Sequence, residues 1–298
     1  MAWWKFDEGG GSTVADSVSK RQDSVKGNFK YIDGVSGSGI KFDGFTTRIA
    51  CRAQDSPRLM EGFTIEAWVA PQAYPRNWCA IVNQERKHKA GYFFGIDAFG
   101  RVGLHLAVGG KWYECTSTAA IRFMEKWSHI AGTFDKDRGI VVYIDGRVAG
   151  TLSVQGSPAF ATDVDLQIGR NLTLTEMNPE LLVRPRVNFP ISYSFDGIID
   201  EVKIYDRALS AEEIEGAYQA TKPRGGPVLK WRKLPQLPAG PSRFGAVYCK
   251  LKFYPEWDAL WRVHDYPDIV VGFDEGPYKM VFWRGTNYNM NLVTENGK

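Results

Sequence analysis

The stretch FDGIIDEVKIYDRALSAEEI, residues 195–214, joins the pattern of a β-strand to the start of a helix. Side chains alternate sides along a strand, so we expect Asp200 on one face and Glu201 on the other. Ser210 then precedes Glu213 by three residues, which is the spacing of a capping box. The stretch therefore predicts a strand that carries acidic residues and leads directly into one short, capped helix.

Segments with the same strand pattern recur through the first two thirds of the chain, and turn signals separate them. FTIEAWVAP, residues 63–71, alternates apolar and polar side chains, and Asp145-Gly146 is a strong two-residue hairpin signal. The composition agrees, because the chain has 31 Gly residues and 13% aromatic residues. We predict an all-β fold: a two-sheet antiparallel jelly-roll sandwich with one short C-terminal helix, followed by a partial second β domain.

Proline and glycine mark a boundary after the predicted helix. The segment TKPRGGPVLKWRKLPQLPAGPSR, from Thr221 to Arg243, is typical of a linker. We therefore predict a jelly roll over residues 1–222, a linker over residues 223–243, and the start of a second, truncated β-rich domain over residues 244–298. The abrupt end of that last segment suggests a fragment of a longer protein, with a neighbouring domain covalently attached.

Bulk charge and hydropathy exclude two classes of partner. The formal net charge is only +3, so nothing indicates nucleic acid, and no apolar run is long enough for a membrane helix. None of the four cysteines forms a CxxC pair, which argues against zinc. Cys79 and Cys115 could pair with each other, or all four could be buried free thiols; the sequence leaves both open.

Seven motifs in a fixed order resemble the laminin-G-like jelly-roll domains of the concanavalin-A-like lectin and glucanase superfamily, over about residues 2–220. They are WWKFDEGGGSTVADS, GIKFDG, FTIEAWV, WSHIAGTFD, VYIDGRVAG, LQIGRN and FDGIIDEVKIYDRALSAEEI. The resemblance implies two antiparallel sheets with a curved groove. It also implies a secreted bacterial protein, extracellular or periplasmic, in which such a domain accompanies modules that act on polysaccharides.

Many domains of this family carry one structural calcium ion, so the resemblance implies one here. Calcium prefers six to eight hard oxygen ligands. Asp43 in KFDG and Asp200 in IIDEV are the preferred side-chain ligands, with Asp16 and Asp196 as second choices. The alternative is that these acids cap turns or pair with nearby Lys and Arg.

The glucanases of this fold place their catalytic acids on one strand as Glu-x-Asp-x-(x)-Glu, and this spacing does not occur here. Glu66 has no acidic neighbour two residues away, so we expect it to be a groove or surface residue. His129 and His105 fit structural strand positions, and His88 fits a solvated loop. We therefore predict no catalytic residues within residues 1–222.

Glycan binding is the favoured function, because sugars stack their C–H faces on aromatic rings while polar side chains bind their hydroxyls. The candidates near turns or strand ends are Trp78, Arg86, Tyr92, Trp112 and Tyr113, with Asn83 also available. The alternative is that these aromatic residues are part of the core.

A second function comes from the C-terminal segment. Arg284 and Tyr288 would suit an acidic sugar, since Arg binds carboxylates in a fork and Tyr can donate a proton. The alternative to a binding module is thus the N-terminal fragment of a polysaccharide-degrading enzyme, a lyase or glycoside hydrolase, whose catalytic domain begins after about residue 242.

Overall fold

The computed structural model describes most of the first 223 residues. The described residues are 1–44, 46–72, 75, 77–121, 126–173, 195–223, 270–271 and 281–282. The chain divides into two compact units, one formed by Met1–Val183 with Ile191–Val228 and the other by Arg184–Pro190 with Leu229–Lys298. In the second unit, β17 (Val270–Val271) pairs antiparallel with β18 (Val281–Phe282). Nearly all of the predicted linker and second domain lies outside the described residues.

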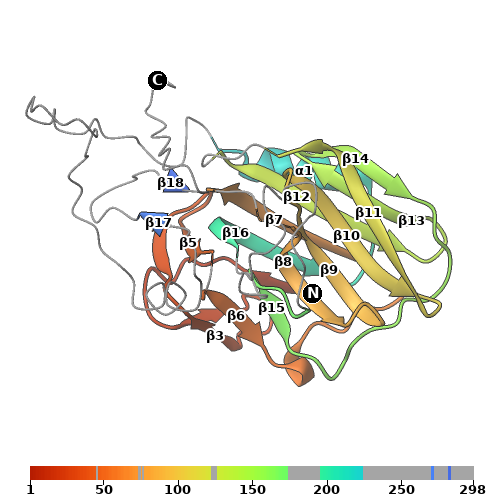
Figure 1. The fold of residues 1–298 in the computed structure, drawn as a ribbon, viewed down its shortest axis with the longest axis horizontal. Helices are drawn as coiled ribbons and strands as arrows, with labels where there is room; N and C mark the ends of the chain where they lie inside the picture. Colours follow the sequence, from red (N-terminus) through yellow and green to blue (C-terminus); the bar gives the residue numbers. More distant parts are fainter. Residues whose placement is uncertain are drawn as a thin grey trace, which may run out of the picture. The chain divides into compact units, whose positions relative to one another are not determined.

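The first unit is a sandwich of two antiparallel sheets (Figure 1). Among the described residues the first sheet has eight strands, in the order β14-β13-β12-β7-β16-β5-β4, with β1 paired to β16. Their bounds are β1 (Ala2–Trp4), β4 (Lys30–Asp33), β5 (Ser38–Asp43), β7 (Gly62–Pro71), β12 (Ser128–Asp135), β13 (Gly139–Ile144), β14 (Arg147–Leu152) and β16 (Asp196–Tyr205).

The second sheet also has eight described strands, in the order β11-β10-β9-β8-β15-β6-β3-β2. Their bounds are β2 (Thr13–Ala15), β3 (Gln22–Lys26), β6 (Arg48–Cys51), β8 (Cys79–Arg86), β9 (Ala90–Ile96), β10 (Arg101–Val108), β11 (Lys111–Ala120) and β15 (Leu166–Ile168). A 3₁₀ helix, η1 (Ala53–Asp55), follows β6. The predicted all-β jelly-roll sandwich with one short helix is confirmed for this unit.

The core lies between the two sheets and is rich in aromatic rings. Phe63 of the first sheet contacts Tyr92 of the second, with ring centroids 5.6 Å apart, and Phe134 at 5.7 Å. All three are fully buried. Each buried ring contributes on the order of 2–3 kcal/mol through its removal from water. Cys51, Cys79 and Cys115 are free and buried. Of the two alternatives that the sequence left open, buried free thiols is therefore the correct one for these three cysteines.

Helix α1 (Ala211–Thr221) covers part of the outer face of the first sheet. Ile214 is fully buried in a small cluster with Ala131 and Tyr143 of that sheet. Tyr218 stacks on Trp68 with ring centroids 5.7 Å apart. The predicted capping box is confirmed, with the Ser210 hydroxyl accepting from the Glu213 amide. Within the described residues, no helix is long and apolar enough to cross a membrane.

A β-bulge interrupts β16 and changes the expected faces of its acidic residues. The pairing with β7 shifts between Asp200, which lies opposite Trp68, and Lys203, which lies opposite Glu66. Glu201 has a positive φ of 52°, and its carboxylate lies 3.7 Å from the Lys203 ammonium. Strict alternation, which placed Glu201 opposite to Asp200, is therefore wrong, because a bulge leaves two successive residues on one side.

Glu66 is a second correction, because it is buried and not at the surface. Its Oε1 accepts hydrogen bonds from Lys203 Nζ and Tyr205 Oη, both at 3.1 Å. Its Oε2 lies 3.5 Å from Nε2 of the buried His129. Burial alone would raise the pKa of Glu66, but His129 and Lys203 outweigh burial and lower it to about 2. Glu66 thus forms a buried ionic cluster on the first sheet, next to Trp68.

Candidate ligand pocket on the second sheet

A row of side chains crosses the outer face of the second sheet, one from each of five adjacent strands. Strand register places Glu114 opposite His105, His105 opposite Phe93, Phe93 opposite Asn83, and Asn83 opposite Gln167. Their neighbours along the strands, such as Leu104 and Leu106 beside His105, point into the core. Alternation therefore puts the whole row on the side away from the first sheet.

Small residues flank this row and make room for a covering ring. Gly103 and Gly95 lie opposite each other on one side of it. A Cβ at Gly103 would come within 2.6 Å of both the Trp78 indole and His105 Nε2. Trp78 therefore lies directly over a position where only hydrogen fits. Its ring meets the His105 ring edge-on, with centroids 4.4 Å apart.

The opposite side of the row is bounded by a tight hairpin turn between β8 and β9. Lys87 and His88 both have positive φ, 47° and 58°. The turn brings the His88 ring flat onto Trp112, with centroids 4.9 Å apart. The buried Glu85 carboxylate accepts a hydrogen bond of 2.9 Å from the His88 amide and so fixes the turn.

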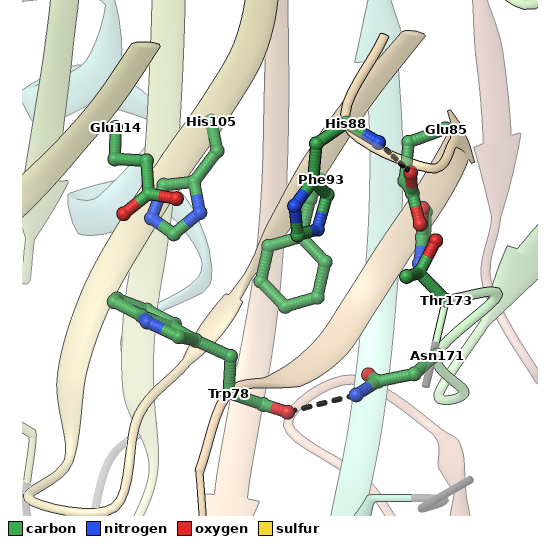
Figure 2. Close-up of a pocket in the computed structure, with 9 residues that line it drawn as sticks. Trp78, Glu85, His88, Phe93, His105, Glu114, Asn171 and Thr173 are labelled. Carbon is green, nitrogen blue, oxygen red and sulfur yellow. Dashed lines mark hydrogen bonds between the residues drawn. The ribbon is translucent and has the colours of Figure 1, made fainter. Parts of the chain in front are cut away.

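Trp78 and these groups line a pocket that is partly open to solvent (Figure 2). Its lining consists of Trp78, Asn83, Glu85, His88, Phe93, His105, Glu114, Asn171 and Thr173. Asn171 fixes the backbone on both sides of the Trp78–Cys79 link: its amide donates to the Trp78 carbonyl at 2.8 Å and accepts from the Ala80 amide at 2.7 Å. These two hydrogen bonds thus fix the backbone that carries the Trp78 ring.

Several buried polar atoms of the row have no hydrogen-bond partner among the residues that the structure describes. They are Asn83 Oδ1 and Nδ2, His105 Nε2 and Gln167 Oε1. Asn83 is only 1% exposed and His105 only 4%. Burial and the nearby His88 lower the pKa of His105 to about 3, so its imidazole is neutral at physiological pH. An unsatisfied buried polar group costs about 1–3 kcal/mol. Of the residues that carry these atoms, Asn83 and His105 line the pocket.

The structure brings some of the predicted binding residues to this pocket and removes others. Trp78 and Asn83 line it, and Trp112 supports it from behind His88. Arg86 lies just outside and forms an ion pair with Asp163. Tyr92 is fully buried in the core between the sheets. The prediction for Tyr92 is therefore wrong, because it points to the opposite face of β9.

Tyr113 does not join the pocket either. It lies opposite Leu106, a core residue, and packs against the core from the inner face of β11. The sequence reasoning also missed Glu85, His88, Phe93, His105 and Glu114, of which His88 had been expected in solvent. The alternation of β9, β10 and β11 could have grouped Phe93, His105 and Glu114 on one face. It could not have shown which face carries a pocket.

The predicted calcium ligands lie at two separate places on one pair of strands. Asp43 lies opposite Asp196 across β5 and β16, whereas Asp200 comes four residues further along β16. That separation is roughly 13 Å at the usual rise along a strand. One ion cannot bind both Asp43 and Asp200. The described residues contain no group of three or more His, Cys, Asp and Glu side chains that could hold a metal ion.

Backbone groups bind the carboxylates of these aspartates. Asp200 Oδ2 accepts from the amides of Val35 and Ser36 at 2.7 and 3.2 Å. Asp43 Oδ1 accepts from the amides of Thr46 and Thr47, both at 2.9 Å. Hydrogen bonds from backbone amides to these carboxylates are what the turn-capping alternative predicts. Calcium binding stays a prediction. Asp16 likewise accepts from backbone amides, including that of Trp3. Burial raises the pKa of Asp200 to about 7.

Comparison with solved structures finds the same fold in several other proteins. Domain 4 of AbnA, an extracellular GH43 arabinanase from Geobacillus stearothermophilus in complex with arabinotriose, aligns with a TM-score of 0.53 and 16% identity over 73% of this chain and 97% of that domain. The binding domain of Paraclostridial Mosquitocidal Protein 1 aligns with a TM-score of 0.54 and 16% identity, over 74% of this chain.

Botulinum neurotoxin type C, described as interacting with two ganglioside molecules, aligns with a TM-score of 0.51 and 11% identity, over 74% of this chain. The match spans about half of the mosquitocidal and neurotoxin chains, 51% in each case. At these identities the likeness concerns the fold.

A comparison with curated protein sequences found no match. The Laminin_G_3 family, described as the Concanavalin A-like lectin/glucanases superfamily, matches residues 42–215. This match confirms the resemblance drawn from the seven motifs. Because it covers more than half of the chain, the protein belongs to the Concanavalin A-like lectin/glucanases superfamily.

Proposed function

We propose that the pocket on the second sheet binds a glycan, and that the domain is a non-catalytic carbohydrate-binding or adhesion module. One observation carries this proposal: among the described residues, the buried Asn83 amide and the Nε2 atom of His105 have no hydrogen-bond partner, and both side chains line a pocket walled by aromatic rings. Hydroxyl groups of a sugar both donate and accept hydrogen bonds, so they suit these atoms. The Trp78 ring supplies the flat surface on which C–H faces pack.

Two of the structural relatives support the class of ligand. One carries arabinotriose, and another is described as interacting with gangliosides. We further propose that the protein is a secreted bacterial one, extracellular or periplasmic, that processes polysaccharides and has a covalently attached neighbouring domain. The alternative, a degrading enzyme whose catalytic domain begins after residue 242, depends on Arg284 and Tyr288. Both residues lie outside the described part of the chain.

Replacing Asn83 by leucine tests the proposed function. Leucine has nearly the shape of asparagine but no polar atoms, and replacing unpaired polar groups by apolar ones is close to neutral or stabilising. We therefore expect Asn83→Leu to bind at least tenfold more weakly to the glycan that an array selects for the full chain, with an unchanged or higher melting temperature. Gln22→Ala, at an exposed position of the same sheet, is the matched control.

Two results would contradict the proposal. Full affinity in Asn83→Leu would exclude the pocket as the binding site. An array on which the intact chain retains no glycan would argue against carbohydrate binding altogether.

We also propose a structural calcium ion. Since Asp43 and Asp200 lie too far apart to share it, we place the ion at the strand pair of Asp43 and Asp196, two acidic residues that lie opposite each other in the register of β5 and β16. Backbone carbonyls would have to complete the coordination.

A further inference from the structure

The charge of the pocket lining is one-sided. Of the described residues that line the pocket, Glu85 and Glu114 carry negative charge, and none is Lys or Arg. We propose that this pocket selects uncharged sugars and rejects sugars that carry a carboxylate or sulfate. This inference rests on the proposed glycan binding and specifies its substrate class.

Glu85 makes the larger contribution to this selectivity. Its side chain is only 2% exposed, and its fixed position comes from the hydrogen bond with the His88 amide. A buried charge is poorly screened by salt, so it repels an anion in the pocket strongly. Glu85 follows Asn83 by two residues on β8, so its side chain lies on the same face of the sheet, where the polar groups of a ligand would bind.

Glu114 extends the negative lining to the other end of the row. It lies opposite His105 across β10 and β11, and its Oε1 accepts a 3.2 Å hydrogen bond from the Trp112 indole. Figure 2 shows Glu114 and Glu85 at opposite ends of the group of lining side chains. Because Glu114 is exposed, its repulsion is weaker and more sensitive to salt.

The described residues that line the pocket include no Lys or Arg that could offset these two carboxylates. The pKa of His105 is lowered to about 3 by burial, so this ring is uncharged at neutral pH. The nearby Arg86 is paired with Asp163 and does not line the pocket. Proteins that bind acidic sugars through Arg use a guanidinium fork, and the described lining lacks one.

Hydrogen-bonding capacity points the same way as charge. The unpartnered Asn83 amide offers one acceptor oxygen and a donor nitrogen. A sugar hydroxyl can donate to the oxygen and accept from the nitrogen. A carboxylate or sulfate placed at Asn83 only accepts hydrogen bonds, so it could pair with the nitrogen but would leave Asn83 Oδ1 without a donor.

The test measures binding of the full chain to acidic polysaccharides and to the same polymers after their carboxylates are methyl-esterified. Polygalacturonate, alginate and hyaluronan serve as the acidic probes, and arabinan, galactan, xylan and β-glucan as neutral ones. We expect the tightest binding to a neutral or esterified polymer. Each acidic polymer should bind at least tenfold more weakly than its ester, or not at all.

Variants identify the cause of the selectivity. Glu85→Gln keeps an acceptor for the His88 amide but removes the charge, so it should reduce the difference between acid and ester by several fold. Glu114→Gln should do so to a smaller extent, and mainly at low salt. Glu61→Gln is the control, because Glu61 is exposed and pairs with Lys136 away from the pocket.

The outcomes separate this inference from the proposed function. An acidic polymer that binds as tightly as its ester overturns the charge selectivity while glycan binding stands. An unchanged difference in both Glu85→Gln and Glu114→Gln overturns it too. If no polymer of either kind binds, the proposed function itself fails.

Discussion

At the scale of single residues, the position of the Trp78 ring over the pocket depends on the absence of a side chain at Gly103. Gly103 must lack a side chain, because a Cβ there would overlap the Trp78 indole and His105 Nε2 at 2.6 Å. Gly103→Ala should therefore displace Trp78 and weaken glycan binding at least tenfold. Titration with the glycan identified on the array, by isothermal calorimetry, measures this loss.

Gly10 supplies the control for that substitution. A Cβ at Gly10 meets nothing within 4 Å, and its φ is not positive. Gly10→Ala should bind like the original protein. Equal affinities of Gly103→Ala and Gly10→Ala would mean that the position of Trp78 does not matter for the ligand.

The buried Glu66 predicts how stability depends on pH. The pKa of Glu66 in the folded state, about 2, lies below the ordinary value of 4.5. Its contribution is therefore complete above about pH 4.5 and is lost as the pH falls toward 2. Between pH 6 and pH 3, we expect the native protein to lose about 2 kcal/mol more unfolding free energy than Glu66→Gln loses. Urea unfolding at both pH values measures this difference, and identical losses would contradict the assignment.

Some of these residues could be predicted from the sequence and others could not. Trp78 and Asn83 were found because an aromatic ring and an amide lie near a turn. Tyr92 met the same criterion and proved to be a core residue. Alternation shows which side chains share a face of a strand. Which of the two faces is buried becomes known only when the second sheet is seen packed against the first.

At the scale of elements, helix α1 offers two substitutions of opposite sign. Gly216 lies inside the helix, and a Cβ there would meet nothing within 4 Å. Gly216→Ala should raise the unfolding free energy by about 0.5–1 kcal/mol, because alanine loses less backbone entropy. Ser210→Ala removes the cap that accepts from the Glu213 amide and should lower it by about 1 kcal/mol. Chemical denaturation measures both changes in unfolding free energy. If Gly216→Ala has a lower unfolding free energy than the original protein, helix propensity does not determine stability at this position.

Strand β16 shows why local patterns fail at particular points. The capping box depends on contacts three residues apart, and the sequence predicted it correctly. The bulge at Glu201 depends on how β7 and β16 align, which involves residues more than a hundred positions apart. Strict alternation thus held at Ile199, which points into the core, and failed two residues later.

At the scale of the whole molecule, the order of motifs was enough to predict the sandwich, and the pocket was not predictable. The row from Glu114 to Gln167 is assembled from five strands, and Gln167 reaches Asn83 only because β15 inserts beside β8. Burial of unpaired polar atoms appears only once that register is known. The site is therefore a property of the assembled sheet rather than of any one segment.

Calcium binding is the prediction that concerns the stability of the whole molecule. An ion that binds only the folded state adds about 2.7 kcal/mol at a hundredfold excess over its dissociation constant. We expect the melting temperature in calcium to exceed that in chelator by about 5–10 °C, from the usual 2–4 °C per kcal/mol for a domain of this size. Equal melting temperatures in calcium and chelator would contradict the proposal.

Two aspartate variants locate the ion. Asp43→Asn should remove the calcium effect, because Asp43 faces Asp196 across the strands. Asp200→Asn should keep it, since Asp200 comes four residues after Asp196 on β16, roughly 13 Å away from the proposed position. Glu201→Ala would not serve as a neutral control, because Glu201 accepts from the Trp3 indole. If Asp200→Asn alone loses the calcium effect, the ion lies at the other end of the strand pair, where the sequence also predicted a ligand.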